Sequence, residues 1–80
     1  MHDIEIHYFA LLREQARRST ERLTTAAATP AQLYEELRGV HGFTLPLTML
    51  RVAVNDEFCD WGTALRQGDR VVFIPPVAGG

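Results

Sequence analysis

The stretch TPAQLYEELRGVHG, residues 29–42, carries the clearest structural signal in the chain. Thr29 is a typical N-cap residue, Pro30 suits the first helical position, and Gln32 completes a capping box. Gly42 can end the helix in the left-handed conformation that residues with a Cβ atom adopt only at a cost. The stretch therefore predicts one well-capped helix over residues 30–41.

The predicted helix has a single apolar stripe. Leu33, Leu37 and Val40 are spaced at i, i+4 and i+7, which places them on one face of the helix. One stripe can be buried against only one layer, so we expect these three residues to pack on a β-sheet.

The segments around this helix favour β-structure. Alternating or β-branched residues predict strands, and a run of good helix formers predicts a short second helix. The predicted strands cover residues 3–9, 20–25, 50–54, 57–60 and 71–74, and the short helix covers residues 10–18. Asn55 and Asp56 supply a tight turn between two strands, although the glycine that such turns prefer is absent.

This order of elements predicts an α+β fold of the ubiquitin-like β-grasp type. One main helix packs across a mixed sheet, and the first and last strands are neighbours at the centre of the sheet. We expect a single domain over residues 1–80, with a flexible C-terminal tail at residues 75–80.

The composition limits the classes of function. The formal net charge of −2 provides no basic surface for nucleic acid. A single cysteine excludes an internal disulfide and suits a reducing compartment. The N-terminus has no basic-then-apolar signal pattern, and no apolar run approaches the ~20 residues of a membrane helix. We therefore expect a soluble, cytoplasmic protein that binds neither nucleic acid nor a membrane.

The residues that most often carry out catalysis form no recognisable site. His2, His7 and His41 lack metal-ligand spacing, and Cys59 has no histidine near it in the sequence. Cys59 lies within a predicted strand, where a small buried apolar side chain is the expected role. We therefore expect no metal site, no bound cofactor and no active site within this chain.

The C-terminal segment has a different character. The predicted strand RVVFI at residues 70–74 runs into PPVAGG at residues 75–80. Pro75 and Pro76 cannot donate to a sheet ladder and hold an extended, semi-stiff backbone. Gly79 and Gly80 have no side chain, so a carboxylate on Gly80 is open to attack and can enter a narrow channel. Such a segment is typical of a tail that inserts into another protein.

Three motifs spread over nearly the whole chain resemble a known family. They are YFALLRE at residues 8–14, VAVN at residues 52–55 and GDRVVFIPPVAGG at residues 68–80, of which the last is the most specific. With these motifs the sequence resembles the small subunits of molybdopterin synthase, the MoaD branch of the ubiquitin-like sulfur carriers. NDEF at residues 55–58 departs from the Asn-Gly type of turn that is more usual there.

The resemblance implies a function for the two terminal glycines. An ATP-dependent, E1-like activating enzyme would adenylate the carboxylate of Gly80, which follows Gly79, and a sulfur donor system would convert it to a thiocarboxylate. The loaded tail would then enter a larger partner subunit and donate sulfur to cyclic pyranopterin monophosphate in molybdenum cofactor biosynthesis. The chain would be the non-catalytic sulfur-donor subunit of a hetero-oligomeric transferase, with ATP used only by the activating enzyme.

Strand phase predicts the surface that meets this partner. If every second residue of each strand faces the helix, the residues between them face the other side of the sheet. There they form an exposed apolar patch that leads to the tail. The predicted partner-binding residues are Phe9, Phe58, Val72, Ile74, Pro75, Pro76 and Val77.

Two other readings remain open. The chain is a sulfur carrier for thiamine or tRNA thiolation or a protein modifier, or else a non-catalytic β-grasp interaction module. The short helix after the first strand and the PPVAGG segment favour the molybdopterin synthase subunit over the other carriers. A plain interaction module has no need of the Gly-Gly pair.

Overall fold

The computed structural model describes residues 1–76 of the chain. Its elements follow the predicted order, and their boundaries agree with the predicted ones within two residues. They are β1 (His2–Tyr8), α1 (Ala10–Ala16), β2 (Thr20–Thr25), α2 (Pro30–His41), the 3-10 turn η1 (Leu47–Met49), β3 (Arg51–Val54), β4 (Glu57–Cys59) and β5 (Arg70–Ile74). None of the helices formed by residues 1–76 has the length and apolar character needed to span a bilayer.

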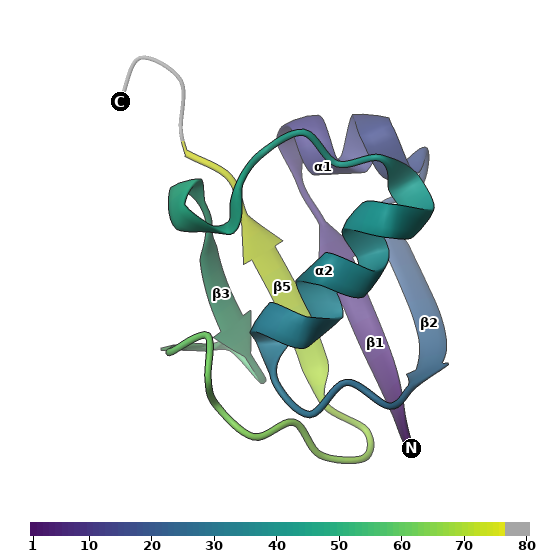
Figure 1. Ribbon diagram of the computed structural model, residues 1–80, viewed down its shortest axis with the longest axis vertical. Helices are drawn as coiled ribbons and strands as arrows, with labels where there is room; N and C mark the ends of the chain where they lie inside the picture. The colour runs from purple at the N-terminus through teal and green to yellow at the C-terminus, as the bar shows by residue number, and fades with distance from the viewer. Residues whose placement is uncertain (77–80) are drawn as a thin grey trace.

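The five strands form one mixed sheet in the order β2-β1-β5-β3-β4. The first and last strands, β1 and β5, pair in parallel at its centre, and all other pairs are antiparallel. Helix α2 crosses one face of this sheet, and α1 lies at the end of the sheet where β5 ends (Figure 1). This is the predicted ubiquitin-like β-grasp arrangement, with one face of the sheet covered by α2 and the other face open.

The ends of α2 are capped as the sequence predicts. The Thr29 hydroxyl accepts a hydrogen bond of 3.2 Å from the backbone N–H of Gln32. At the other end, Gly42 has a φ of 72° and donates its N–H to the carbonyl of Arg38 at 2.9 Å. These local bonds satisfy groups that every helix end leaves unpaired, which explains why the boundaries were predictable.

The buried face of α2 differs from the predicted stripe at one residue. Leu33 and Leu37 are buried as expected, but Val40 is 68% exposed, so its assignment to the core was wrong. The helix buries Tyr34 instead. His41 lies four residues after Leu37 and seven after Tyr34, so it takes the sheet-facing position in the last turn, where its ring contacts Phe43.

Aromatic rings fill the space between α2 and the sheet. Tyr34 stacks on Phe43, with ring centroids 5.7 Å apart, and its edge meets the ring of Phe73 at 5.3 Å. Trp61 stacks on Phe73 at 5.9 Å and also lies 6.2 Å from the Tyr34 ring, so the three rings form one cluster. Because Phe73 belongs to β5, this packing holds the last strand firmly between the helix and its neighbouring strands.

A polar cluster joins the end of α2 to β2. The Tyr8 hydroxyl donates to the Glu21 carboxylate at 2.7 Å, and His41 Nε2 lies 2.8 Å from the same oxygen. Burial by itself would raise the pKa of Glu21, but the hydrogen bonds from Tyr8 and His41, together with Arg18, hold that pKa below its usual value. The cluster therefore stabilises the charged form of Glu21.

Two consecutive residues with positive φ form the turn between β3 and β4. Asn55 and Asp56 have φ values of 52° and 72°, and Val54 pairs with Glu57 across the turn. This is the geometry of a type I′ hairpin, which Asn and Asp tolerate better than other residues with a side chain. The predicted tight turn without glycine is confirmed.

Candidate functional site

The predicted tail starts from the centre of the sheet. Strand β5 pairs with β1 on one side and with β3 on the other, and its last residue, Ile74, lies opposite Arg51. Pro75 follows and is buried, and Pro76 is exposed. A central strand paired on both sides is a rigid support, and the two prolines extend that stiffness beyond the sheet. Pro76 is therefore the first tail residue with a side chain available to a partner.

The remaining tail residues lie outside the described part of the chain. They include Val77, predicted to contact the partner, and Gly79 and Gly80, predicted to carry the chemistry. Their roles stay predictions. The described structure supplies the position from which they start, at the end of the sheet next to α1 (Figure 1).

The open face of the sheet carries the other predicted contact residues. Phe9 is 48% exposed and Phe58 is 64% exposed, while Val72 and Ile74 are half-buried. The register connects them: Ala53 of β3 lies between Val72 and Phe58. Phe9 follows Tyr8, the partner of Phe73, and so lies at the same end of the sheet as Ile74. We call Phe9, Phe58, Val72 and Ile74 the apolar patch; Ala53 is buried, with 7% of its surface exposed, and lies beneath it.

A basic residue lies within this apolar patch. The guanidinium carbon of Arg51 is 4.9 Å from the centre of the Phe58 ring, a cation–π contact. Arg51 was not among the predicted partner-binding residues. It was within reach of the sequence, because in a strand where Val52 faces the helix the neighbouring Arg51 faces outward.

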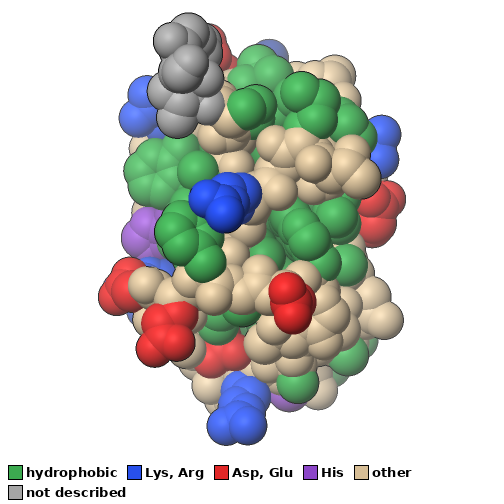
Figure 2. All heavy atoms as spheres, turned by 90° about the vertical axis from the view of Figure 1, so that its left-hand side faces the viewer, with side chains coloured by type: hydrophobic (Ala, Val, Ile, Leu, Met, Phe, Trp, Pro, Cys, Tyr) green, Lys and Arg blue, Asp and Glu red, His purple; other side chains and the backbone are tan. Residues whose placement is uncertain are grey.

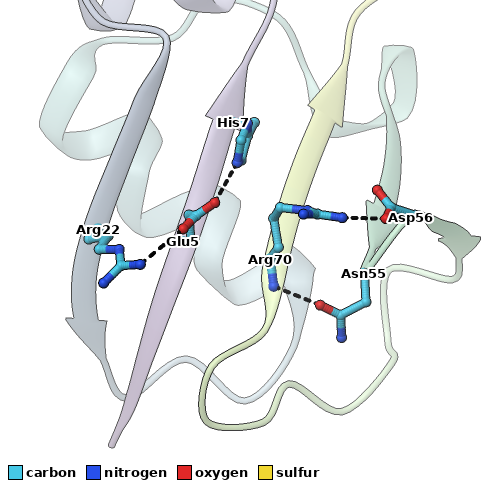
Figure 3. A network of polar contacts seen from close by, with 6 residues as sticks. All are labelled: Glu5, His7, Arg22, Asn55, Asp56 and Arg70. Atoms are coloured by element: carbon cyan, nitrogen blue, oxygen red, sulfur yellow. Dashed lines mark hydrogen bonds and ion pairs between the residues drawn. The ribbon is translucent and has the colours of Figure 1, made fainter.

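A network of charged side chains borders the apolar patch on the open face (Figure 3). Glu5 lies 2.7 Å from the His7 ring and 3.3 Å from Arg22. The Arg70 guanidinium forms an ion pair with the carboxylate of Asp56 in the β3–β4 turn. The hydrogen bond from His7, with the charge of Arg22, lowers the pKa of Glu5. These charged side chains therefore lie on the open face between the apolar patch and the end of the sheet farthest from the tail.

Residues 1–76 contain no group of three His, Cys, Asp or Glu side chains placed to hold a metal ion. His7 and His41 each use Nε2 in a hydrogen bond to a glutamate. Cys59 is half-buried and packs against the core, in agreement with the structural role predicted for it. The described residues therefore form a recognition surface, in which apolar side chains and one guanidinium lie beside the start of the tail.

The sequence profile of the ThiS family matches residues 6–80, which is nearly the whole chain. The chain belongs to the ThiS family. The match includes β5, the two prolines and the Gly-Gly pair, so it covers both the sheet and the tail of the candidate site. The predicted membership of the ubiquitin-like sulfur-carrier group is confirmed.

Solved structures similar to this ThiS-family chain match it over nearly its whole length. SAMP1 from Haloferax volcanii is 30% identical with a TM-score of 0.79, covering 98% of this chain and 99% of that one. A putative molybdopterin converting factor subunit 1 from Pyrococcus furiosus is 25% identical with a TM-score of 0.79, covering 96% and 100%. A chain from the complex of subunits 1 and 2 of the molybdopterin-converting factor of Helicobacter pylori is 25% identical with a TM-score of 0.68, covering 98% and 99%.

Proposed function

We propose that this ThiS-family protein is the sulfur-carrier subunit of a molybdopterin synthase. In this proposal the working group is the carboxylate of Gly80, converted to a thiocarboxylate, which donates its sulfur to cyclic pyranopterin monophosphate. The observation that supports it best is β5, a central strand that runs through two prolines toward Gly79–Gly80 beside an apolar patch. A cytoplasmic location is part of the proposal and fits the single free cysteine.

The chemistry needs activation before transfer. A carboxylate is a poor electrophile, so the activating enzyme joins it to the AMP part of ATP and releases pyrophosphate. A donor sulfur at the oxidation level of sulfide then attacks the acyl carbon, and AMP leaves. The resulting thiocarboxylate is a good nucleophile at sulfur. General acids, bases and cations for the phosphate come from the activating enzyme and the large subunit.

The apolar patch is the proposed docking surface for the large subunit. The H. pylori relative forms a complex of two subunits, which supports a partner of this kind here. Phe9→Asp or Ile74→Asp would place a charge on this surface without entering the core, so folding should change little. Each variant should weaken binding by about thirtyfold or more, the effect of losing roughly 2 kcal/mol at one interface anchor. Unchanged affinities in calorimetric titration would place the interface elsewhere.

The test of the carrier role is sulfur loading. The chain is incubated with ATP, the activating enzyme and a sulfur source, and its intact mass is measured together with that of its C-terminal peptide. We expect the mass change of one oxygen replaced by sulfur on Gly80. A variant with one residue added after Gly80 should melt at the same temperature and gain no sulfur. Sulfur on the extended variant, or on Cys59, would contradict the proposal.

A second candidate is a protein modifier, favoured by the 30% identity to SAMP1, a small archaeal modifier protein. Both functions need an activated Gly80, so sulfur loading alone does not separate them. An affinity-tagged chain expressed in its own cells should appear only at its own mass if it is a carrier. Covalent adducts of higher mass that persist in denaturant and disappear when Gly80 is deleted would instead identify a modifier.

A further inference from the structure

Arg51 combines a positive charge with an apolar setting. It is exposed on the open face of the sheet, opposite Ile74, the last strand residue before the tail. Its guanidinium stacks over the Phe58 ring, so both side chains belong to one surface. Figure 2 shows that apolar side chains gather on the side of the molecule where β3 lies in Figure 1. A charge in such a place would lose its water when a partner covers the surface.

Arg51 differs from the other arginines of this sheet face in its pairing. Arg22 pairs with Glu5, and Arg70 pairs with Asp56. Arg51 has no acidic side chain within ion-pair distance among residues 1–76. The guanidinium carbon lies over the Phe58 ring. Among residues 1–76, the arginine side chains that donate hydrogen bonds are those of Arg22 and Arg70, so the N–H groups of Arg51 are available as donors.

The contact with Phe58 also restricts the position of the guanidinium. A long arginine side chain normally loses much rotamer freedom when it binds. Stacking on an aromatic ring removes part of that freedom before the partner arrives, so less is lost on binding. A surface hollow borders the apolar patch, and its lining consists of Leu50, Arg51, Val52, Phe58, Cys59, Asp60 and Trp61. Asp60 is the acidic side chain of this lining and forms no ion pair with Arg51, so an incoming carboxylate would meet the guanidinium on the side away from Asp60. The site is therefore preorganised for one polar contact.

We infer that Arg51, positioned by Phe58, binds a carboxylate of an Asp or Glu side chain on the protein that docks on the apolar patch. A carboxylate matches the planar guanidinium through two parallel hydrogen bonds, and it removes the cost of burying an unpaired charge. A phosphate ligand would call for several cations, whereas the neighbouring arginines of this face are already paired with acids. This inference rests on the proposed function in one respect, the choice of the large subunit as the docking partner.

The test is a titration of the purified large subunit from the same organism with the wild-type carrier and four variants. Arg51→Met keeps the apolar stem and should weaken binding about 10- to 100-fold. Arg51→Lys keeps the charge but loses the paired geometry, and its affinity should fall between those of the wild type and Arg51→Met. Arg51→Glu should bind more weakly than Arg51→Met, because it opposes the partner's carboxylate. Arg66→Met is the matched control, since Arg66 is also exposed but lies in the loop before β5; its affinity should stay within about twofold of the wild type.

The role of Phe58 is tested by a double-mutant cycle. Phe58→Leu keeps an apolar side chain but removes the aromatic face that holds Arg51. If Phe58 acts through Arg51, this change should weaken binding in the wild-type background and have a smaller effect in the Arg51→Met background. Equal effects in both backgrounds would show that Phe58 contributes only its own contact and would overturn the positioning role.

Three results would overturn the carboxylate assignment. They are equal affinities of Arg51→Met and the wild type, equal affinities of Arg51→Lys and the wild type, or an Arg51→Glu variant that binds no more weakly than Arg51→Met. The melting temperature of each variant, followed by Trp61 fluorescence, should match that of the wild type, because Arg51 is exposed and makes no core contact.

Sulfur loading of the same variants separates failure of this inference from failure of the proposed function. If the wild type acquires sulfur at Gly80 and all Arg51 variants bind the large subunit normally, the carrier role stands and the Arg51 assignment is wrong. If Arg51 variants bind weakly but the wild type never acquires sulfur, the docking assignment stands and the carrier role is wrong.

Discussion

Leu37→Ala should destabilise the protein by several kcal/mol, whereas Val40→Ala on the same helix should not destabilise it. The side chain of Leu37 lies on the sheet-facing side of α2 and is 2% exposed, whereas that of Val40 is 68% exposed. Leu37→Ala removes three methylene-sized groups from the core, about 2.4 kcal/mol of transfer free energy at ~0.8 kcal/mol each. The cavity left behind adds to this, so we expect a total loss of about 3–4 kcal/mol.

This loss is large for a chain of 80 residues. Domains of this length have a free energy of unfolding of about 4–12 kcal/mol, so the variant should lose a quarter of its stability or more. Val40→Ala should change the free energy of unfolding by less than about 0.5 kcal/mol, in the stabilising direction if at all, because alanine is the better helix former.

The assay is urea unfolding followed by the fluorescence of Trp61, the only tryptophan, which stacks on Phe73 in the core. With a slope of ~1 kcal/mol per molar urea for so small a domain, the Leu37→Ala midpoint should fall by about 3–4 M. Similar midpoints for the two variants, or a larger loss for Val40→Ala, would show that α2 packs through the stripe predicted from the sequence and would refute the orientation of α2 described above.

Three further variants, at two positions, test local features of the fold. Glu21→Gln removes the carboxylate whose pKa is lowered in the folded state, so it should reduce stability above the ordinary glutamate pKa of about 4.3. The deficit relative to the wild type should shrink as the pH falls below that value, because protonation removes the same charge; unfolding curves at pH 6 and pH 3 with a constant deficit would contradict this. Ala10 opens α1 with a φ of 51°, in the left-handed region, so Ala10→Gly should raise the melting temperature and Ala10→Val should lower it. Thermal unfolding measures both, and a lower melting temperature for Ala10→Gly would count against strain at this position.

The proposed function separates two roles within one small domain. The aromatic packing around Phe73 holds β5 in the core. Under the proposal, the open face of the sheet serves recognition and the C-terminal segment serves the chemistry. Variants of the apolar patch and variants of Gly80 should therefore affect different steps.

The sequence alone determined the local features of this protein. The caps of α2, the Asn55–Asp56 turn and the alternation of the strands all depend on residues close together in the chain. The outward placement of Phe9 and Phe58 followed from the same alternation, because side chains of a strand point to its two faces in turn. These features were predictable because their physical causes act over a few residues.

Tertiary structure decided which distant residues meet. His41 and Glu21 are 20 positions apart, and Asp3 and Gln67 are 64 positions apart, yet each pair is hydrogen-bonded. The same packing turned α2 so that it buries Tyr34 and exposes Val40, a rotation that spacing alone did not define. It also placed Arg51 over Phe58 at the start of the tail. Helical periodicity restricts the buried face to a sector, and the sheet and the aromatic rings beneath the helix select the residue within that sector.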